Sequence, residues 1–378
     1  MQLQPFLLDM WLDNYEHDIE FNLASSSGPS WTVNAVLNLA GEEERRRFLN
    51  HELVYGRPAG ADGLREAIAG MHDVSTECVQ IVTGASEALV VLMWLAAEPG
   101  ANVILPRPGF ATFSALPESL GIETRFYEIR REHNFTIDVE EIITLADART
   151  SLILVNSPHH PTGATLSDRE MERLHEFTSG RGIQLVSDEV YHPIYHGRET
   201  QSASRLPQAT VIHDFSKAFS LPGVRTGWMI EHDRTRRERY RNARAYFSVS
   251  NNSAGEMLAE VAMRRRDVVL RTTHETAKHN LEHLDRFMAA HRETLAWIRP
   301  QGGMTAFPWL VNDGNARPFC QAAVERGILL APGDCFGVPS HFRLGFAATG
   351  HKFPQALDRL GEFVTDWPAT KIASRQSA

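Results

Sequence analysis

The sequence predicts an α/β protein: a three-layer α/β/α unit around a mostly parallel, mixed sheet, followed by a smaller α+β unit. The first observation is a series of short apolar runs, at residues 78–82, 102–105, 151–155, 183–187 and 209–213. The second is that helical patterns, such as 84–97 and 167–179, stand between the runs. The third is that the runs do not alternate apolar with polar residues, which is typical of parallel strands buried on both faces.

The flanking segments predict the remaining elements. The first thirty residues form an amphipathic stretch that ends in a loop of small residues, 25–29. Residues 231–292 are helical and charged, and residues 293–378 mix short strands with two helices. We therefore expect an N-terminal segment, 1–45, that packs with the small domain, a large domain, 46–275, and a small C-terminal domain, 276–378.

Composition narrows the possible partners. A net charge of −9 argues against binding nucleic acid through overall basicity, and the arginine-rich stretches within 232–267 contain acids, as solvated helix faces do. Three widely spaced cysteines indicate neither a disulfide framework nor a CxxC metal site. The N-terminus lacks a signal-peptide pattern, and no window of about 18 apolar residues exists. We expect a cytoplasmic protein without membrane or nucleic-acid partners.

The chain has only four lysines, at positions 217, 278, 352 and 371. Arginine stays protonated, so these four are the side-chain amines that can act as nucleophiles. Lys217 follows an apolar run and lies among small and aromatic residues, where burial favours a neutral amine that can form a Schiff base. A Leu-Pro-Gly turn then leads to Arg225, which can hold an anionic group nearby.

Three further segments follow predicted strands. Asp188 and Tyr191 come after run 183–187, and α/β sheets bind ligands at the carboxyl ends of their strands. A carboxylate there can keep a pyridine nitrogen protonated, although this motif alone is more simply an acidic loop cap. Residues 156–163 form an irregular loop rich in proline. Residues 83–89 pass from strand to helix, and their small side chains let backbone N–H groups approach a phosphate at the helix start.

Together, in this order and over roughly residues 20–365, these segments resemble the class I/II aminotransferases, the fold type I pyridoxal-phosphate enzymes. The resemblance implies a homodimeric enzyme that binds pyridoxal 5′-phosphate through its large domain and acts on an amino acid through an external aldimine and a quinonoid. Lys217 would be the Schiff-base lysine and proton shuttle. Asp188 would pair with the pyridine nitrogen, and Tyr191 with the ring hydroxyl.

The same resemblance implies roles for further residues. Phosphate contacts would come from the segment Gly84, Ala85 and Ser86, from Ser216 and Arg225, and from Tyr55 of the neighbouring subunit. Phe110 would stack on the cofactor ring, unless it is an ordinary core residue. Arg343 would take the substrate α-carboxylate in a bidentate pair, and Ser27 and Gly28 would lie where the N-terminal loop passes the substrate.

Two positions depart from the family pattern. The family usually has asparagine where this chain has His160, and serine or threonine where it has Asp214. A titratable ring at 160, which would contact the cofactor, can change the cofactor's electronics. A carboxylate at 214 repels a phosphate unless it is protonated or turned away. These departures leave simple transamination open to question.

Segments 25–28, 155–163, 301–307 and 327–337 resemble the capreomycidine synthase branch of the family. That branch implies loss of a hydroxyl from a hydroxylated arginine and closure of a guanidine ring, in secondary metabolism. An acid should then face the guanidinium, and Asp9 and Glu16 are the candidates, although a solvated helix face explains each more simply. Transamination and this elimination or cyclisation are the two leading hypotheses.

Two other interpretations are weaker. A non-catalytic regulator on this scaffold would usually carry a helix-turn-helix domain ahead of it, for which the sequence has no room. A metal site is not predicted, because Pro193 interrupts the helical spacing between His192 and His196.

Overall fold

A seven-stranded sheet forms the centre of the fold in the computed structural model, which describes residues 2–311 and 314–376. The strand order is β2-β8-β7-β6-β5-β3-β4. The strands are β2 (Val79–Val82), β3 (Asn102–Arg107), β4 (Glu123–Glu128), β5 (Thr150–Asn156), β6 (Gln184–Asp188), β7 (Ala209–Asp214) and β8 (Gly227–Ile230). Neighbours pair in parallel except at β8, which runs antiparallel to β2 and β7. The sheet is therefore mostly parallel, with one reversed strand.

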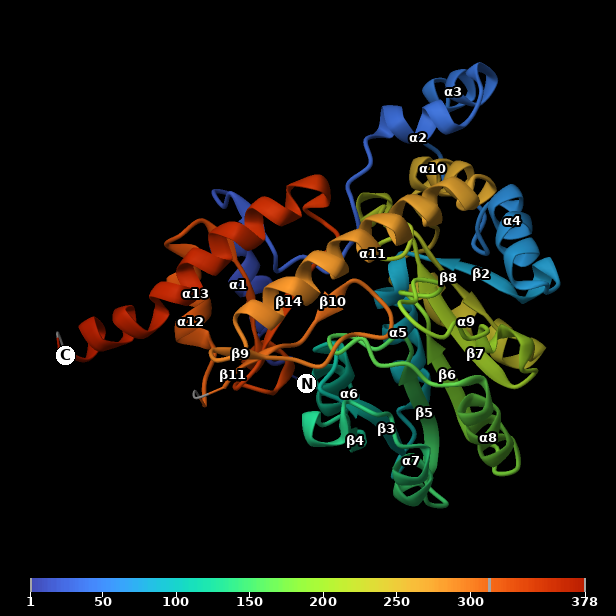
Figure 1. Cartoon of the computed structure of the whole chain (residues 1–378). Coiled ribbons are helices and arrows are strands. Elements are labelled where there is room, and N and C mark those ends of the chain that lie inside the picture. The colour runs from blue at the N-terminus through green and yellow to red at the C-terminus, as the bar shows by residue number, and fades with distance from the viewer. Residues whose placement is uncertain (1, 312–313, 377–378) are drawn as a thin grey trace.

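Helices cover both faces of this sheet (Figure 1), so the predicted three-layer class is confirmed. Successive side chains of a strand face opposite sides, and in β3 Ile104 belongs to one buried cluster while Val103 and Leu105 belong to the other. The Val103 side packs against α5 (Gly84–Ala96), α6 (Thr112–Leu120) and α9 (Arg234–Phe247). The Ile104 side packs against α4 (Asp62–His72), α7 (Val139–Leu145) and α8 (Asp168–Ser179).

The apolar runs of the sequence locate β2, β3, β5, β6 and β7 to within two residues at each end. Two strands were missed. β4 lies at the edge of the sheet and is half exposed, so its residues alternate with charged side chains rather than forming an apolar run. β8 has only four residues and follows a tight turn, so local pattern does not reveal it or its reversed direction.

The C-terminal part contains short strands in three small sheets, as far as the described residues go. These pair β1 (Phe21–Asn22) with β12 (Ile328–Leu329), β9 (Leu295–Ala296) with β11 (Trp309–Leu310), and β14 (Phe342–Gly345) with β10 (Thr305–Ala306) and β13 (Ala331–Pro332). Its helices are α12 (Arg317–Val324) and α13 (Phe353–Gln376), which packs against the long α11 (Arg266–Ala290). None of the described helices combines the length and apolar character needed to cross a membrane.

The N-terminal residues divide between the two parts of the molecule. α1 (Leu7–Tyr15) packs against β13, and the Trp11 indole donates a 2.8 Å hydrogen bond to the carbonyl of Leu330. α2 (Val33–Leu39) instead packs against α10 (Ser253–Arg264), and α3 (Glu42–Leu49) lies beyond it (Figure 1). The domain limits at residues 45 and 275 stay predictions.

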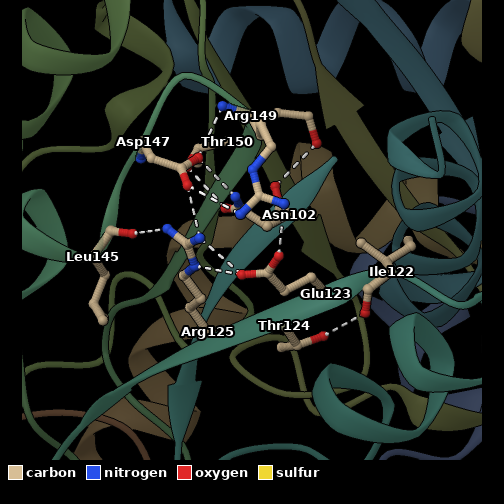
Figure 2. Close-up of polar contacts among 10 residues, drawn as sticks. Asn102, Ile122, Glu123, Thr124, Arg125, Leu145, Asp147, Arg149 and Thr150 are labelled. Carbon is tan, nitrogen blue, oxygen red and sulfur yellow. Dashed lines mark hydrogen bonds and ion pairs between the residues drawn. The ribbon is translucent and has the colours of Figure 1, made fainter. Parts of the chain in front are cut away.

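Ion pairs tie together the amino ends of three neighbouring strands (Figure 2). Arg125 of β4 pairs with Glu123 at 2.8 Å and with Asp147 at 2.7 Å, and Arg149 pairs with the same two carboxylates. Asn102 of β3 also donates to Asp147 at 2.9 Å. Partly exposed pairs of this kind stabilise a fold only slightly. This network lies at the opposite end of the strands from the polar residues that follow β5, β6 and β7.

Buried neutral histidines make the fold sensitive to acid. Burial is the largest cause that lowers the pKa of five of them, to about 3 or about 4: His72, His159, His196, His213 and His341. The pKa of a histidine in the unfolded chain is about 6.5. Below that pH these histidines are therefore protonated in the unfolded chain but stay neutral in the folded one. Stability is therefore full above pH 6.5 and is lost as the pH falls towards 4.

We expect the free energy of unfolding to change little between pH 7.5 and pH 6.5 and then to fall towards pH 5, by up to about 1.4 kcal/mol per pH unit for each such histidine. Urea unfolding at several pH values measures this slope. His72 forms hydrogen bonds with Ser204 and Trp228. Replacing it with glutamine should reduce the slope of the unfolding free energy against pH by about 1.4 kcal/mol per pH unit, the contribution of one proton. A stability that is flat between pH 7.5 and pH 5 would contradict the prediction.

Candidate active site

A cavity of about 740 Å³ lies where the strands of the large sheet end, between that sheet, α1 and the small C-terminal sheets. Carboxyl ends of parallel strands are where α/β sheets bind ligands. The ends of β5, β6 and β7 each contribute one polar side chain to its wall, namely Asn156, Asp188 and Asp214. Lys217 comes from the segment after β7, and Arg343 comes from β14 of the C-terminal part. The cavity therefore joins residues that lie far apart in the sequence.

Lys217 is half-buried in this cavity, and its ammonium Nζ donates a 2.8 Å hydrogen bond to Ser26 Oγ. Burial, together with the nearby Arg343 and Arg225, lowers the pKa of Lys217 to about 8, although Asp214 opposes the shift. A lysine with such a pKa supplies a useful fraction of neutral amine near neutral pH. The role of Lys217 as the nucleophile stays a prediction, and this environment suits it.

Asp188 is buried at the end of β6 and accepts a 3.3 Å hydrogen bond from the backbone N–H of Val190. Burial raises the pKa of Asp188 to about 7, with Asp214 and Glu189 adding to the shift. A buried carboxylate of this kind gains from a cationic partner, because the partner stabilises its charged form. Asn156 supports the same strand end by donating a 3.0 Å hydrogen bond to the carbonyl of Asp188.

The Tyr191 side chain is buried, and burial raises the pKa of its hydroxyl. Among the described residues, its hydroxyl has no hydrogen-bond partner of good geometry. A buried hydroxyl normally has a partner, so an unsatisfied one at a cavity wall is suited to a ligand atom. The His160 ring stacks beside it, with centroids 6.3 Å apart and planes 10° apart.

An anion cradle forms where α5 begins. Gly84 has φ +74°, a conformation that favours glycine, and a β-carbon there would lie only 2.9 Å from a guanidinium nitrogen of Arg225. The backbone N–H of Ala85 and the N–H and hydroxyl of Ser216 point to one place, where they all bond the Asp214 carboxylate. Helix N-termini with such donors bind phosphate. Ser86 also lines the cavity at this end.

Arg343 is buried on the other side of the cavity, which lowers its pKa to about 10. Two of its guanidinium nitrogens donate to the carbonyl of Ala24 in the N-terminal loop. The third lies 2.8 Å from His160 Nε2. Burial, followed by the neighbouring Arg343, keeps the pKa of His160 well below its usual value, so the neutral ring accepts this hydrogen bond at Nε2. The departure at residue 160 thus orients Arg343.

α1 forms part of the cavity wall. Asp9 and Glu16 both line it while remaining largely exposed, together with the apolar Phe6 and Leu12. Phe110 lines the cavity too, and its ring packs edge-on against Phe6 with centroids 5.6 Å apart. This part of the cavity wall is therefore mainly apolar, with two exposed acids.

Most residues predicted from the sequence line this one cavity; Gly28, Tyr55 and Gly84 do not. Gly28 packs against Ser220, whose hydroxyl would lie 2.0 Å from a β-carbon at that position, while Ser27 does line the cavity. Tyr55 is 85% exposed in the segment between α3 and α4. Gly84 begins α5 beside the cradle but is not itself part of the lining.

Sequence reasoning missed Ser26 and Asn156 as site residues. Ser26 belongs to the loop 25–29 and Asn156 to the loop 156–163, both described from the sequence. The position of Asn156 at the end of a strand could have indicated a ligand-binding residue. Nothing local marks Ser26 among three consecutive serines. Its role depends on Lys217, which lies 191 residues further along the chain.

The groups in the cavity fit pyridoxal 5′-phosphate. The cradle suits its phosphate, the buried carboxylate of Asp188 suits a protonated pyridine nitrogen, and the unsatisfied hydroxyl of Tyr191 suits a ring oxygen. The Lys217 amine, with its lowered pKa, suits the aldehyde.

Comparisons with known proteins agree with this chemistry. Residues 22–360 match the family model for aminotransferase class I and II. Capreomycidine synthase of Streptomyces vinaceus is 26% identical over 94% of this chain and 92% of its own. Arginine–pyruvate transaminase AruH of Pseudomonas aeruginosa is 26% identical over 81% of each chain.

Solved structures are similar over almost the whole chain. A PLP-dependent aminotransferase from Streptococcus suis has a TM-score of 0.90 and 26% identity, and covers 97% of this chain and 98% of its own. The PLP-dependent cyclase OrfR has a TM-score of 0.88, with 26% identity and the same coverage.

Proposed function

Because this chain belongs to the aminotransferase class I and II family and is a pyridoxal 5′-phosphate-dependent enzyme, we propose that it acts at the α-carbon of an amino acid with a cationic side chain. The observation that carries the proposal is the shared lining of one cavity by Lys217, Asp188 and Arg343, with two exposed acids in the same lining. Arg343 suits the α-carboxylate, and the acids suit a guanidinium or ammonium group.

The roles of the chain's own residues follow from their chemistry. The bound cofactor supplies an electron sink that makes the α-hydrogen acidic. In the proposal Lys217 anchors the cofactor and its Nζ moves the α-proton, while Ser26 Oγ orients Nζ at 2.8 Å. Asp188 keeps the ring nitrogen protonated. Arg343, held by Ala24 and His160, fixes the carboxylate so that the α-hydrogen faces Lys217.

Two outcomes are possible after the α-proton has left, and the fold permits both. Transamination is the first candidate, and AruH is an arginine–pyruvate transaminase. Elimination and ring closure on a hydroxylated arginine is the second. It is supported by the coverage of capreomycidine synthase, the similarity to a cyclase and the histidine at position 160.

One pair of experiments tests the proposal. Exchange of the α-hydrogen of arginine and hydroxyarginines with D₂O, followed by NMR, reports proton removal whatever the outcome. Mass balance of the products then separates the candidates, because transamination yields a 2-oxo acid while cyclisation keeps the substrate amine. Absence of exchange with every cationic amino acid, when neutral ones do exchange, would overturn the substrate class.

Asp9 of α1 and Glu16, which directly follows this helix, should influence cationic substrates alone. We expect the double change Asp9→Asn and Glu16→Gln to raise KM for arginine-like substrates about 3- to 20-fold, because exposed ion pairs contribute only about 0–1 kcal/mol each. The effect should weaken with added salt, which screens exposed charges. Steady-state kinetics with a cationic and a neutral amino acid measure it.

Asp13→Asn is the matched control, since Asp13 lies on the same helix but does not line the cavity. It should leave both KM values unchanged. An equal rise of KM for the neutral substrate would show that α1 acts through its packing rather than its charge.

We further propose a homodimer. Large apolar side chains are exposed on the surface of the large domain, at Leu49, Leu53, Val54, Tyr55, Trp94, Tyr246, Phe247 and Val249. Some of them are contiguous, since the rings of Trp94 and Phe247 lie 5.8 Å apart and residues 53–55 are consecutive, and contiguous exposed apolar groups are typical of association surfaces. Tyr55 lies among them and would reach the phosphate cradle of the second subunit.

Sedimentation velocity should give a particle with twice the mass of one chain. Changing Leu53 and Tyr246 to aspartate should weaken association about 100-fold or more, because each buries an unpaired charge. Val311→Asp is the control, since Val311 is 45% exposed but lies in the C-terminal part. A monomeric wild-type protein at micromolar concentration would contradict the dimer.

A further inference from the structure

The carboxylate of Asp214 already occupies the anion cradle at the start of α5. Asp214 ends β7 and is only 6% exposed. Its Oδ1 accepts a 2.9 Å hydrogen bond from the backbone N–H of Ser216, and its Oδ2 accepts one of 2.9 Å from the Ser216 hydroxyl. Oδ2 also accepts from the backbone N–H of Ala85 at 3.4 Å. An ionised carboxylate has only acceptors, so it uses these three donors as a phosphate would.

The surroundings of the cradle are positively charged. The Arg225 guanidinium lies over the first residue of α5, as its 2.9 Å approach to a β-carbon at Gly84 requires. The start of a helix carries partial positive charge and favours anions. Lys217 is also close enough to be attracted by Asp214. The carboxylate of Asp214 therefore supplies this positive region with a negative charge from within the chain.

We propose that Asp214 is an internal anion that competes with the cofactor phosphate for these donors and so limits the affinity that the phosphate contributes. The inference rests on the proposed function, which puts the phosphate in this cradle. A phosphate carries about −1.5 to −2 charges, and a neighbouring carboxylate repels it. Its entry requires Asp214 to give up Ser216 and Ala85. A serine at position 214 would offer a donor instead and would remove the repulsion.

The test compares pyridoxal 5′-phosphate with pyridoxal, which lacks the phosphate. Equilibrium titration of dialysed full-length protein, followed by cofactor absorbance, gives both dissociation constants for the wild type, Asp214→Ser and Asp214→Asn. We expect both variants to bind the phosphorylated cofactor at least tenfold more tightly, while pyridoxal affinity stays nearly constant. Asparagine keeps the size of the side chain and removes only the charge, so it guards against misfolding of the serine variant.

Glu87→Gln is the matched control. Glu87 is also a carboxylate in the first turn of α5, but it pairs with Arg244 and Ser248 rather than with the cradle. We expect it to change the ratio of the two dissociation constants much less than either Asp214 variant. Inorganic phosphate should also compete with the cofactor more strongly in the Asp214 variants than in Glu87→Gln.

The outcomes separate the two proposals. If both cofactors bind but their affinity ratio is unchanged or reduced in Asp214→Ser and Asp214→Asn, Asp214 supports the phosphate and the inference is overturned alone. If neither cofactor binds the wild type, the proposed function fails and the inference fails with it. A larger ratio in both variants, and not in Glu87→Gln, supports competition.

Discussion

Replacing Lys217 with alanine is expected to abolish the visible absorption of the bound cofactor and to lower turnover by at least about 10⁴-fold. The reason is that one amine serves both as the covalent anchor and as the group that moves the α-proton, and proton transfer alone contributes about 10²–10⁴-fold. Borohydride reduction followed by peptide mapping should place the cofactor on Lys217 in the wild type and nowhere in the variant.

Lys217→Arg separates charge from nucleophilicity. Arginine keeps a positive charge beside Asp214 and Asp188, so the buried carboxylates retain a partner, yet it cannot lose its proton. We expect it to fold and to be as inactive as the alanine variant. Lys278→Ala, which alters an exposed lysine on α11, should retain activity and the label. Turnover in Lys217→Ala, or a borohydride label on another lysine, would contradict the role of Lys217 as covalent anchor and proton-transfer group.

Asp188→Asn should retain the covalently bound cofactor but reduce kcat by about 10²–10³-fold. Asparagine has nearly the same shape but no charge, so the ring nitrogen loses the buried carboxylate that keeps it protonated. Removing one member of a buried charge pair costs about 2–5 kcal/mol, which corresponds to a loss of this size. Measuring kcat together with the visible spectrum distinguishes lost electron withdrawal from lost cofactor.

The adjacent buried carboxylate provides the control. Glu189 Oε1 accepts hydrogen bonds from the Ser187 hydroxyl and the Ala203 N–H, and this side chain does not line the cavity. Glu189→Gln should therefore lower the melting temperature and leave kcat near the wild-type value. If Glu189→Gln lost as much activity as Asp188→Asn, the effect would reflect local packing rather than charge at the ring.

The apolar runs of the sequence predicted the fold class, because buried parallel strands are local apolar runs. The resemblance of the segments after these runs to the aminotransferase family predicted the cofactor and about half of the residues that line the cavity. Lys217, Asp188 and the start of α5 drew attention because each directly follows a predicted strand. The edge strand β4 was not predicted, because a half-exposed strand carries charged residues that interrupt the apolar run.

Only the tertiary structure decided how distant side chains meet. Arg343 bonds His160, which is 183 residues away, and Lys217 bonds Ser26 across 191 residues, and no local pattern encodes either contact. The sequence raised the possibility that Asp214 turns away from a phosphate, whereas packing of β7 against the start of α5 directs it into the cradle. Periodicity depends on a few adjacent residues, but the direction and charge environment of a buried side chain depend on every element packed around it.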